Sequence, residues 1–125
     1  MTTEDRRRVL AVDDSASMRK MVAFTLGSVG ITVAEANDGA VALQMARQEQ
    51  FALLLIDVNM PRLNGIALVK SLRGLPGYQF VPLLMLTTET APARRRDAVE
   101  AGATGWLVKP FSPDQLIATV RRVMA

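Results

Sequence analysis

The sequence contains neither cysteine nor histidine. Without cysteine there is no disulfide and no thiolate metal site. Without histidine the chain lacks the commonest general base and the commonest transition-metal ligand. A metal ion bound by this chain should therefore be a hard cation held by oxygen atoms. The lack of disulfide-forming residues also fits the cytoplasm, where we expect the protein to act.

Long apolar runs and a strong charge are missing as well. No run approaches the roughly 20 residues that cross a bilayer, and residues 1–8 lack the layout of a secretory signal. The net charge is only +3, which is too small to indicate nucleic-acid binding. We therefore expect neither a membrane nor a nucleic-acid partner.

The size and apolar content of the chain predict one globular domain. The chain has 125 residues, of which 50% are hydrophobic, enough to form a proper core. We expect a single domain over 1–125, with its core at about 7–124 and no room for an output domain. We also expect it to act as a monomer.

Five short segments with the pattern of strands alternate with five helical patterns. Strands are expected at 9–12, 32–36, 51–57, 81–86 and 104–108. Helices are expected after a cap at Asp14 or Ser15, at about 40–48, at 66–73 closed by Gly74, at about 92–102, and after the capping box at 112–115. This order predicts an α/β fold, a doubly wound five-stranded parallel sheet with helices on both faces. The flavodoxin-like type of this class has strand order 2-1-3-4-5.

Polar side chains follow four of the five expected strands. They are Asp13, Asp14, Asp57, Thr87, Thr88 and Lys109. The carboxyl ends of parallel strands meet at one edge of the sheet, where ligands bind, so these residues can converge. The run 51–56 is wholly apolar and leads directly into Asp57, as in a strand buried on both faces.

The chemistry of this set favours a phosphoryl site. Carboxylates about 4 Å apart repel each other by roughly 1 to 4 kcal/mol per pair and need a cation, for which Mg²⁺ is suited. Lys109 adds a fixed positive charge, Thr87 a hydroxyl and Thr88 a backbone N–H. Asp57 is then placed to accept a phosphoryl group.

Each residue also has a simpler interpretation. Asp14 could serve only as a helix cap, Thr87 could bond its own backbone, and Lys109 could be an ordinary surface charge. The combination of all these residue types after separate strands of one sheet favours the chemical interpretation.

Four motifs resemble those of the response-regulator receiver domain. They are Val12-Asp13-Asp14-Ser15, Asp57-Val58-Asn59-Met60-Pro61 with Gly65, Leu86-Thr87-Thr88-Glu89, and Val108-Lys109-Pro110-Phe111. The resemblance covers about residues 7–124 and is strongest to single-domain chemotaxis members of the family.

The resemblance implies a role for each position. Asp57 would be the phosphoacceptor, and Mg²⁺ would be held by Asp14, Asp57 and the backbone carbonyl of Asn59, with Asp13 acting partly through water. Lys109 would pair with the phosphoryl group, Thr87 would hydrogen-bond it, and Thr88 and Asn59 would lie beside it. The side chains of Asn59 and Glu89 would tune its hydrolysis, and the Lys109–Pro110 bond would be cis.

Trp106 departs from the pattern of the family. Relatives usually carry a tyrosine, phenylalanine or histidine here, which changes rotamer when Thr87 moves toward the phosphoryl group. Indole is larger than these side chains, so we do not expect the Trp106 ring to pack fully inward. Alternatively, Trp106 is an ordinary strand aromatic that covers the last helix. Arg94, Arg95 and Arg96 form either a solvated helix face or a partner contact.

The resemblance implies a two-component response regulator rather than an enzyme. A histidine kinase, CheA-like if the chain serves chemotaxis, would supply the phosphoryl group. The face formed by the fourth helix, fifth strand and fifth helix would bind a target such as a flagellar motor switch protein. A phosphate sink or relay and a phosphorylation-independent adaptor remain alternatives.

Two other protein classes fit less well. A haloacid-dehalogenase phosphatase needs a carboxylate where this chain has Asn59. A flavodoxin-like cofactor binder needs a phosphate-cradling loop where this chain has Asp13 and Asp14.

Overall fold

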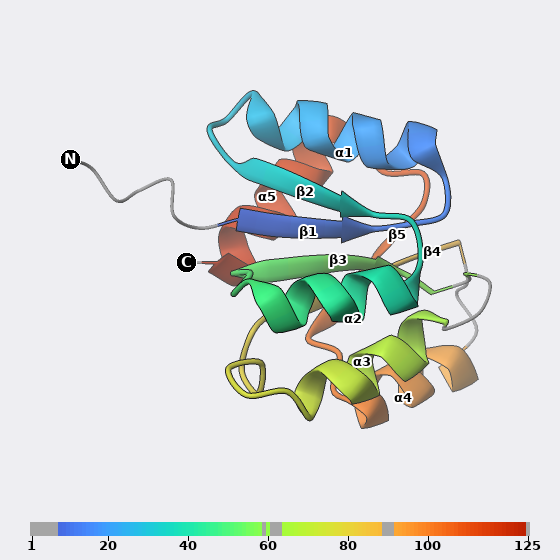
Figure 1. Ribbon diagram of the computed structural model, residues 1–125. Coiled ribbons are helices and arrows are strands. Elements are labelled where there is room, and N and C mark those ends of the chain that lie inside the picture. The colour runs from blue at the N-terminus through green and yellow to red at the C-terminus, as the bar shows by residue number, and fades with distance from the viewer. Residues whose placement is uncertain (1–7, 59, 61–63, 89–91, 125) are drawn as a thin grey trace.

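A computed structural model describes residues 8–58, 60, 64–88 and 92–124. Its five parallel strands form one sheet in the order β2-β1-β3-β4-β5, with β3 at the centre (Figure 1). The strands are β1 (Arg8–Val12), β2 (Thr32–Ala36), β3 (Leu53–Asp57), β4 (Leu83–Thr87) and β5 (Gly105–Val108). The predicted fold class and strand order are therefore confirmed.

Helices cover both faces of the sheet. They are α1 (Ala16–Gly27), α2 (Gly39–Gln48), α3 (Gly65–Arg73), α4 (Pro92–Ala101) and α5 (Pro113–Met124). Helices α1 and α5 lie on one face, and α2, α3 and α4 lie on the other (Figure 1). The doubly wound arrangement places the carboxyl ends of all five strands at one edge.

Side chains at the helix starts fix where several helices begin. The Ser15 hydroxyl accepts from the Met18 N–H at 3.2 Å, and Asp38 caps α2 in the same way. At α5, Ser112 and Gln115 exchange side-chain and backbone hydrogen bonds, which confirms the capping box. Since Ser15 is the cap of α1, Asp14 does not need to serve as one.

The core consists of two apolar layers, one on each side of the sheet. All five residues of β3 are buried, as are all five of β4. Alternate side chains of these central strands enter the layer under α1 and α5 or the layer under α2, α3 and α4. This double burial explains why 51–56 is a continuous apolar run rather than an alternating one.

Several predicted boundaries were displaced. The third strand begins at Leu53, and the buried Phe51 precedes it. The fourth strand runs over Leu83–Thr87 rather than 81–86, because Pro82 has no N–H for the ladder and contributes only its carbonyl, which accepts from Leu54. Gly74 does close α3, but in a right-handed conformation with φ −83° rather than a left-handed one.

Two side chains fix the loop between α3 and β4. The Arg73 guanidinium donates to the carbonyls of Tyr78, Val81 and Gly102 at 2.7–3.0 Å, and burial lowers its pKa. The Tyr78 hydroxyl accepts from the Phe51 N–H at 3.0 Å and donates to the Glu49 carbonyl at 2.6 Å. Burial is the main cause that raises the pKa of Tyr78.

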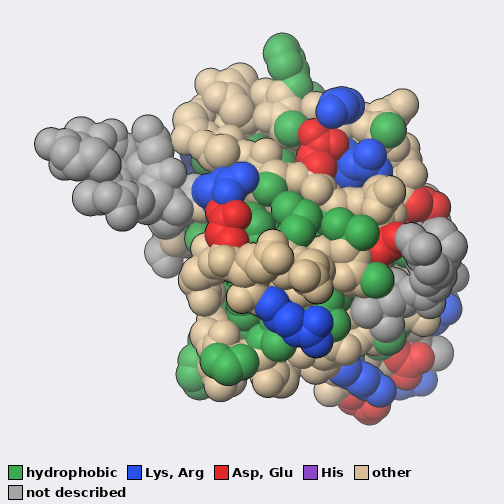
Figure 2. Space-filling model, viewed as in Figure 1, with side chains coloured by type: hydrophobic (Ala, Val, Ile, Leu, Met, Phe, Trp, Pro, Cys, Tyr) green, Lys and Arg blue, Asp and Glu red, His purple; other side chains and the backbone are tan. Residues whose placement is uncertain are grey.

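The surface over α1, β2 and α2 carries charges of both signs. Basic and acidic side chains lie next to each other on this face (Figure 2), and one such group joins Arg19 and Lys20 to Glu35. Within the described part of the chain, no helix combines the length and apolar character needed to span a membrane.

Candidate metal and phosphoryl site

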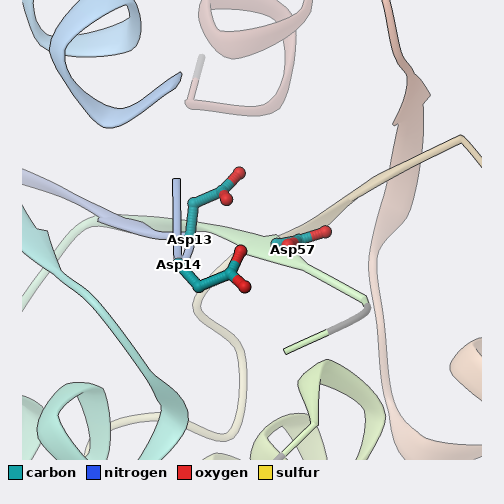
Figure 3. Close-up of side chains that lie close together, drawn as sticks. All are labelled: Asp13, Asp14 and Asp57. Carbon is teal, nitrogen blue, oxygen red and sulfur yellow. The ribbon is translucent and has the colours of Figure 1, made fainter. Parts of the chain in front are cut away.

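Three aspartates meet at the carboxyl edge of the sheet. Asp13 and Asp14 follow β1, and Asp57 ends β3, the neighbouring strand. One carboxylate oxygen from each lies within 4.8 Å of the others, and the three side chains project beyond the strand ends into the same space (Figure 3). Asp13 and Asp57 are buried, whereas Asp14 is exposed. This is a hard, all-oxygen donor set that opens to solvent on one side.

Lys109 brings a single positive charge to this cluster. Its Nζ lies 3.0 Å from Asp13 Oδ2 and 3.4 Å from Asp57 Oδ1. Three carboxylates and one ammonium leave a formal charge of −2 on the four side chains. Such a charge in a partly buried site favours binding of a divalent cation, and the carboxylates fit Mg²⁺.

Arg19 holds the turn that carries the first two aspartates. Its guanidinium donates to the Asp13 carbonyl at 2.7 Å and to Glu35 of β2 at 3.1 Å. The Ser15 N–H donates to Asp13 Oδ1 at 2.9 Å, which orients that carboxylate. Sequence reasoning did not assign a role to Arg19, because its partner Glu35 is 16 residues away in the chain.

Gly65 allows α3 to begin directly against the end of β3. Its N–H donates to the Val58 carbonyl at 3.0 Å. A Cβ at this position would lie 2.3 Å from the Asp57 carbonyl oxygen and 2.9 Å from Val58 Cα. Both are backbone atoms that cannot move aside independently of the strand. The motif in the sequence includes Gly65, but the reason why a glycine is needed there is seen only in the structure.

The two threonines at the end of β4 differ in burial. Thr87 is buried and pairs with Val108 of β5, and its carbonyl accepts from the Lys109 N–H at 2.8 Å. Thr88 is exposed at the same edge. Because Asp57 pairs with Leu86, both threonines lie at the strand end beside the acidic cluster.

Some expected contributors cannot be placed. Asn59, including its carbonyl, and Glu89 lie outside the described residues. The Lys109–Pro110 peptide bond is cis, as the resemblance implied. The predicted site is thus represented here by the three aspartates, Lys109 and the threonines.

Trp106 lies on the α4 side of β5. It is half-buried and packs against the layer under α2, α3 and α4, whereas Leu107 faces the layer under α1 and α5. The alternative that Trp106 covers the last helix is therefore wrong. The cause is register, because Trp106 pairs with Met85, which points into the α4-side layer.

The three arginines of α4 are not a uniform solvated face. Arg96 is exposed, but Arg94 and Arg95 are partly buried. Both line a cavity of about 10 Å³ together with Thr87 and Trp106. The expectation of a solvated helix face therefore holds for Arg96 alone among the three arginines.

Comparison with known proteins shows which family the chain resembles over most of its length. The family profile described as "Response regulator receiver domain" matches residues 9–121. The structure of chemotaxis protein CheY4 from Vibrio cholerae is similar, with a TM-score of 0.91 and 49% identity over 94% of this chain and 98% of that one. A chemotaxis protein CheY homologue of Campylobacter jejuni is 39% identical over 87% of this chain and 85% of its own length.

Longer proteins match as well. A probable transcriptional regulator, ycf27 of Guillardia theta, is 38% identical over 97% of this chain. Here the chain spans only 46% of the relative, so this similarity concerns one part of a larger protein.

Proposed function

Because the chain belongs to the response regulator receiver domain family, we propose that it is a phosphorylation switch in which Asp57 accepts a phosphoryl group from a histidine kinase. In the transfer, the bond between phosphorus and the donor's histidine nitrogen breaks as phosphorus bonds to a carboxylate oxygen of Asp57. The observation that carries the proposal is the convergence of three carboxylates within 4.8 Å beside Lys109. The chain would act as a phosphoacceptor that assists its own phosphorylation and dephosphorylation, and not as an enzyme.

The residues of the site would divide the work between charge and position. Asp57 is the acceptor at the centre of the sheet, and its carboxylate is already oriented by Lys109. Lys109 is shared between Asp13 and Asp57, so it can follow the added charge onto the phosphoryl oxygens. Thr87 and Thr88, at the end of β4, would donate to those oxygens, and the resemblance implies that Asn59 would lie beside them as well. Positioning and charge neutralisation are the main requirements of phosphoryl transfer.

Mg²⁺ is the expected cofactor. Asp13, Asp14 and Asp57 would hold it, together with the Asn59 carbonyl that the resemblance implies. When bound, the ion would offset the formal charge of −2 on the three aspartates and Lys109. Its positive charge also lets a phosphoryl group, which adds about −1.5 to −2, approach three carboxylates.

The partners that we propose are those of chemotaxis. The donor would be a CheA-like histidine kinase, and the target, bound through α4, β5 and α5, would be a flagellar motor switch protein. Support comes from the similarity to chemotaxis proteins along most of their length. The protein would act in the cytoplasm.

Phosphoryl labelling tests the assigned acceptor. With Mg²⁺ and a small acyl phosphate, the protein should gain one acid-stable, base-labile phosphoryl group. Asp57→Asn should gain none, whereas Asp97→Asn, at an exposed site on α4, should label normally. Labelling that persists in Asp57→Asn would rule out the assigned acceptor.

Affinity capture tests the partner. Immobilised protein loaded with a phosphoryl mimic should retain the purified motor switch protein, and Asp57→Asn should not. Equal retention with and without the mimic would indicate an adaptor that does not use phosphorylation. Labelling without any retention would instead favour a phosphate sink or relay.

A further inference from the structure

Arg95 and Trp106 form a stacked pair between α4 and β5. The Arg95 Cζ atom lies 4.6 Å from the centroid of the Trp106 ring, within the range of a cation–π interaction. Tryptophan is the best aromatic partner for a cation, and arginine stacks on it with its planar face. The contact therefore places the cation of one helix residue over the ring of one strand residue.

Part of the guanidinium in this pair is withdrawn from water. Arg95 is partly buried, and its Nε atom is buried with no hydrogen-bond acceptor among the residues that the structure describes. A desolvated cation gains more from an aromatic face than an exposed one does. The indole ring is therefore a principal partner of this side chain.

Behind the ring there is little free space. The cavity there has a volume of about 10 Å³ and is lined by Thr87, Met85 and Ala98 as well as by the stacked pair. This is room for about one water molecule and far too little for an indole. Arg95 and Ala98 are three residues apart on the same face of α4. The ring can thus move inward only if this face of α4 moves.

On its outer side the same pair lines an open groove. This groove has a volume of about 320 Å³ and is bordered by Arg95, Arg96, Val99, Glu100 and Trp106. The stacked pair therefore separates the inner cavity beside Thr87 from the surface of α4. Any movement of the ring changes both.

We propose that Arg95 is a positioning residue that holds the Trp106 ring outward in the unphosphorylated protein and so sets the resting state of the switch. The inference rests on the proposed function, because it concerns how Asp57 phosphorylation reaches α4. A contact made in only one of two states biases the equilibrium toward that state. Loss of the stack therefore favours the switched state and tightens binding of a phosphoryl group at Asp57.

Equilibrium binding of a phosphoryl mimic measures this bias. Beryllofluoride with Mg²⁺ is titrated against the protein, and Trp106, the only tryptophan, reports binding by fluorescence. Arg95→Gln should bind the mimic more tightly than wild type by about two- to thirty-fold, the range expected for a cation–π contact between its exposed and desolvated limits. Its resting emission should also shift toward that of the wild-type complex.

Two further variants separate the stack from general effects. Arg95→Lys keeps a cation near the ring and should stay closer to wild type than Arg95→Gln. Arg96→Gln removes the same charge from an exposed neighbour and should leave affinity and emission unchanged. Circular dichroism and denaturant unfolding check that all three variants fold.

The outcomes distinguish this inference from the proposed function. Asp57 labelling with equal mimic affinities for wild type and Arg95→Gln overturns the role of Arg95 alone. An equal gain in affinity from Arg96→Gln overturns it too, because the effect would then be one of net charge. Failure of the wild-type protein to label at Asp57 overturns both proposals.

Discussion

The acidic site should cost the protein stability when no cation is bound. The three carboxylate oxygens lie at most 4.8 Å from one another. Two unit charges at this distance repel by about 1 kcal/mol in water and by about 3.5 kcal/mol at an effective dielectric constant of 20. Asp14 takes part in two such pairs and is exposed, so the lower value applies to it. Screening by salt reduces the sum further.

Asp14→Asn should therefore stabilise the cation-free protein. We expect its free energy of unfolding in a chelator to rise by about 1 kcal/mol relative to wild type, because the attraction of Lys109 and screening by salt offset part of the repulsion. With Mg²⁺ the order should reverse. A ligand at 100 times its dissociation constant adds about 2.7 kcal/mol to the stability of a protein that binds it only when folded, and the variant has lost one of the three carboxylates.

Denaturant unfolding in EDTA and in excess Mg²⁺ measures both effects. Asp97→Asn is the matched control, because it removes one exposed carboxylate away from the cluster. The reasoning fails if Asp14→Asn is no more stable than this control in EDTA. It also fails if Mg²⁺ stabilises Asp14→Asn as much as it stabilises wild type.

Two further predictions concern the scaffold. Gly65→Ala should lose about 1–3 kcal/mol of stability and bind Mg²⁺ more weakly, because its Cβ would lie 2.3 Å from the Asp57 carbonyl oxygen. Denaturant unfolding and Mg²⁺ titration measure both properties. Gly27→Ala, whose Cβ would meet nothing within 4 Å, is the control and should keep both. Burial raises the pKa of Tyr78 above 10.0. The contribution of the neutral hydroxyl to the free energy of unfolding should therefore be fully present below pH 10 and decrease above it, by at most about 1.4 kcal/mol per pH unit. Tyr78→Phe should lack this alkaline loss but be about 1–3 kcal/mol less stable at neutral pH, because the Phe51 N–H loses its acceptor. Unfolding across pH, with tyrosinate absorbance of the single tyrosine, checks this; an alkaline loss that is the same in both proteins would contradict it.

The fold could be predicted because its signals are local. The central strands β3 and β4 are short apolar runs, and helix caps such as Ser15 and Ser112 follow from the chemistry of their own side chains. The acidic site was predictable for a related reason. A parallel sheet brings the ends of its strands to one edge, so the position of Asp57 directly after an apolar run already indicated where it would lie.

What could not be predicted depends on contacts between distant segments. Arg19 joins Glu35 to the Asp13 carbonyl, and nothing local marks it as different from Lys20 beside it. The side of the sheet on which Trp106 lies depends on register, since β5 is apolar on both faces in the sequence Gly105-Trp106-Leu107-Val108. A shift by one residue would have exchanged Trp106 and Leu107.

The placement of Thr87 links the two halves of the proposed switch. Its carbonyl accepts from the Lys109 N–H, so it lies next to the residue that neutralises Asp57. It also lines the small cavity behind Trp106. If Thr87 moves toward a phosphoryl group, the cavity enlarges by little more than a hydroxyl and a methyl group, which is still too small for an indole. In this chain the signal would therefore have to pass through displacement of α4 with its stacked arginine, and a ring rotation alone would not suffice.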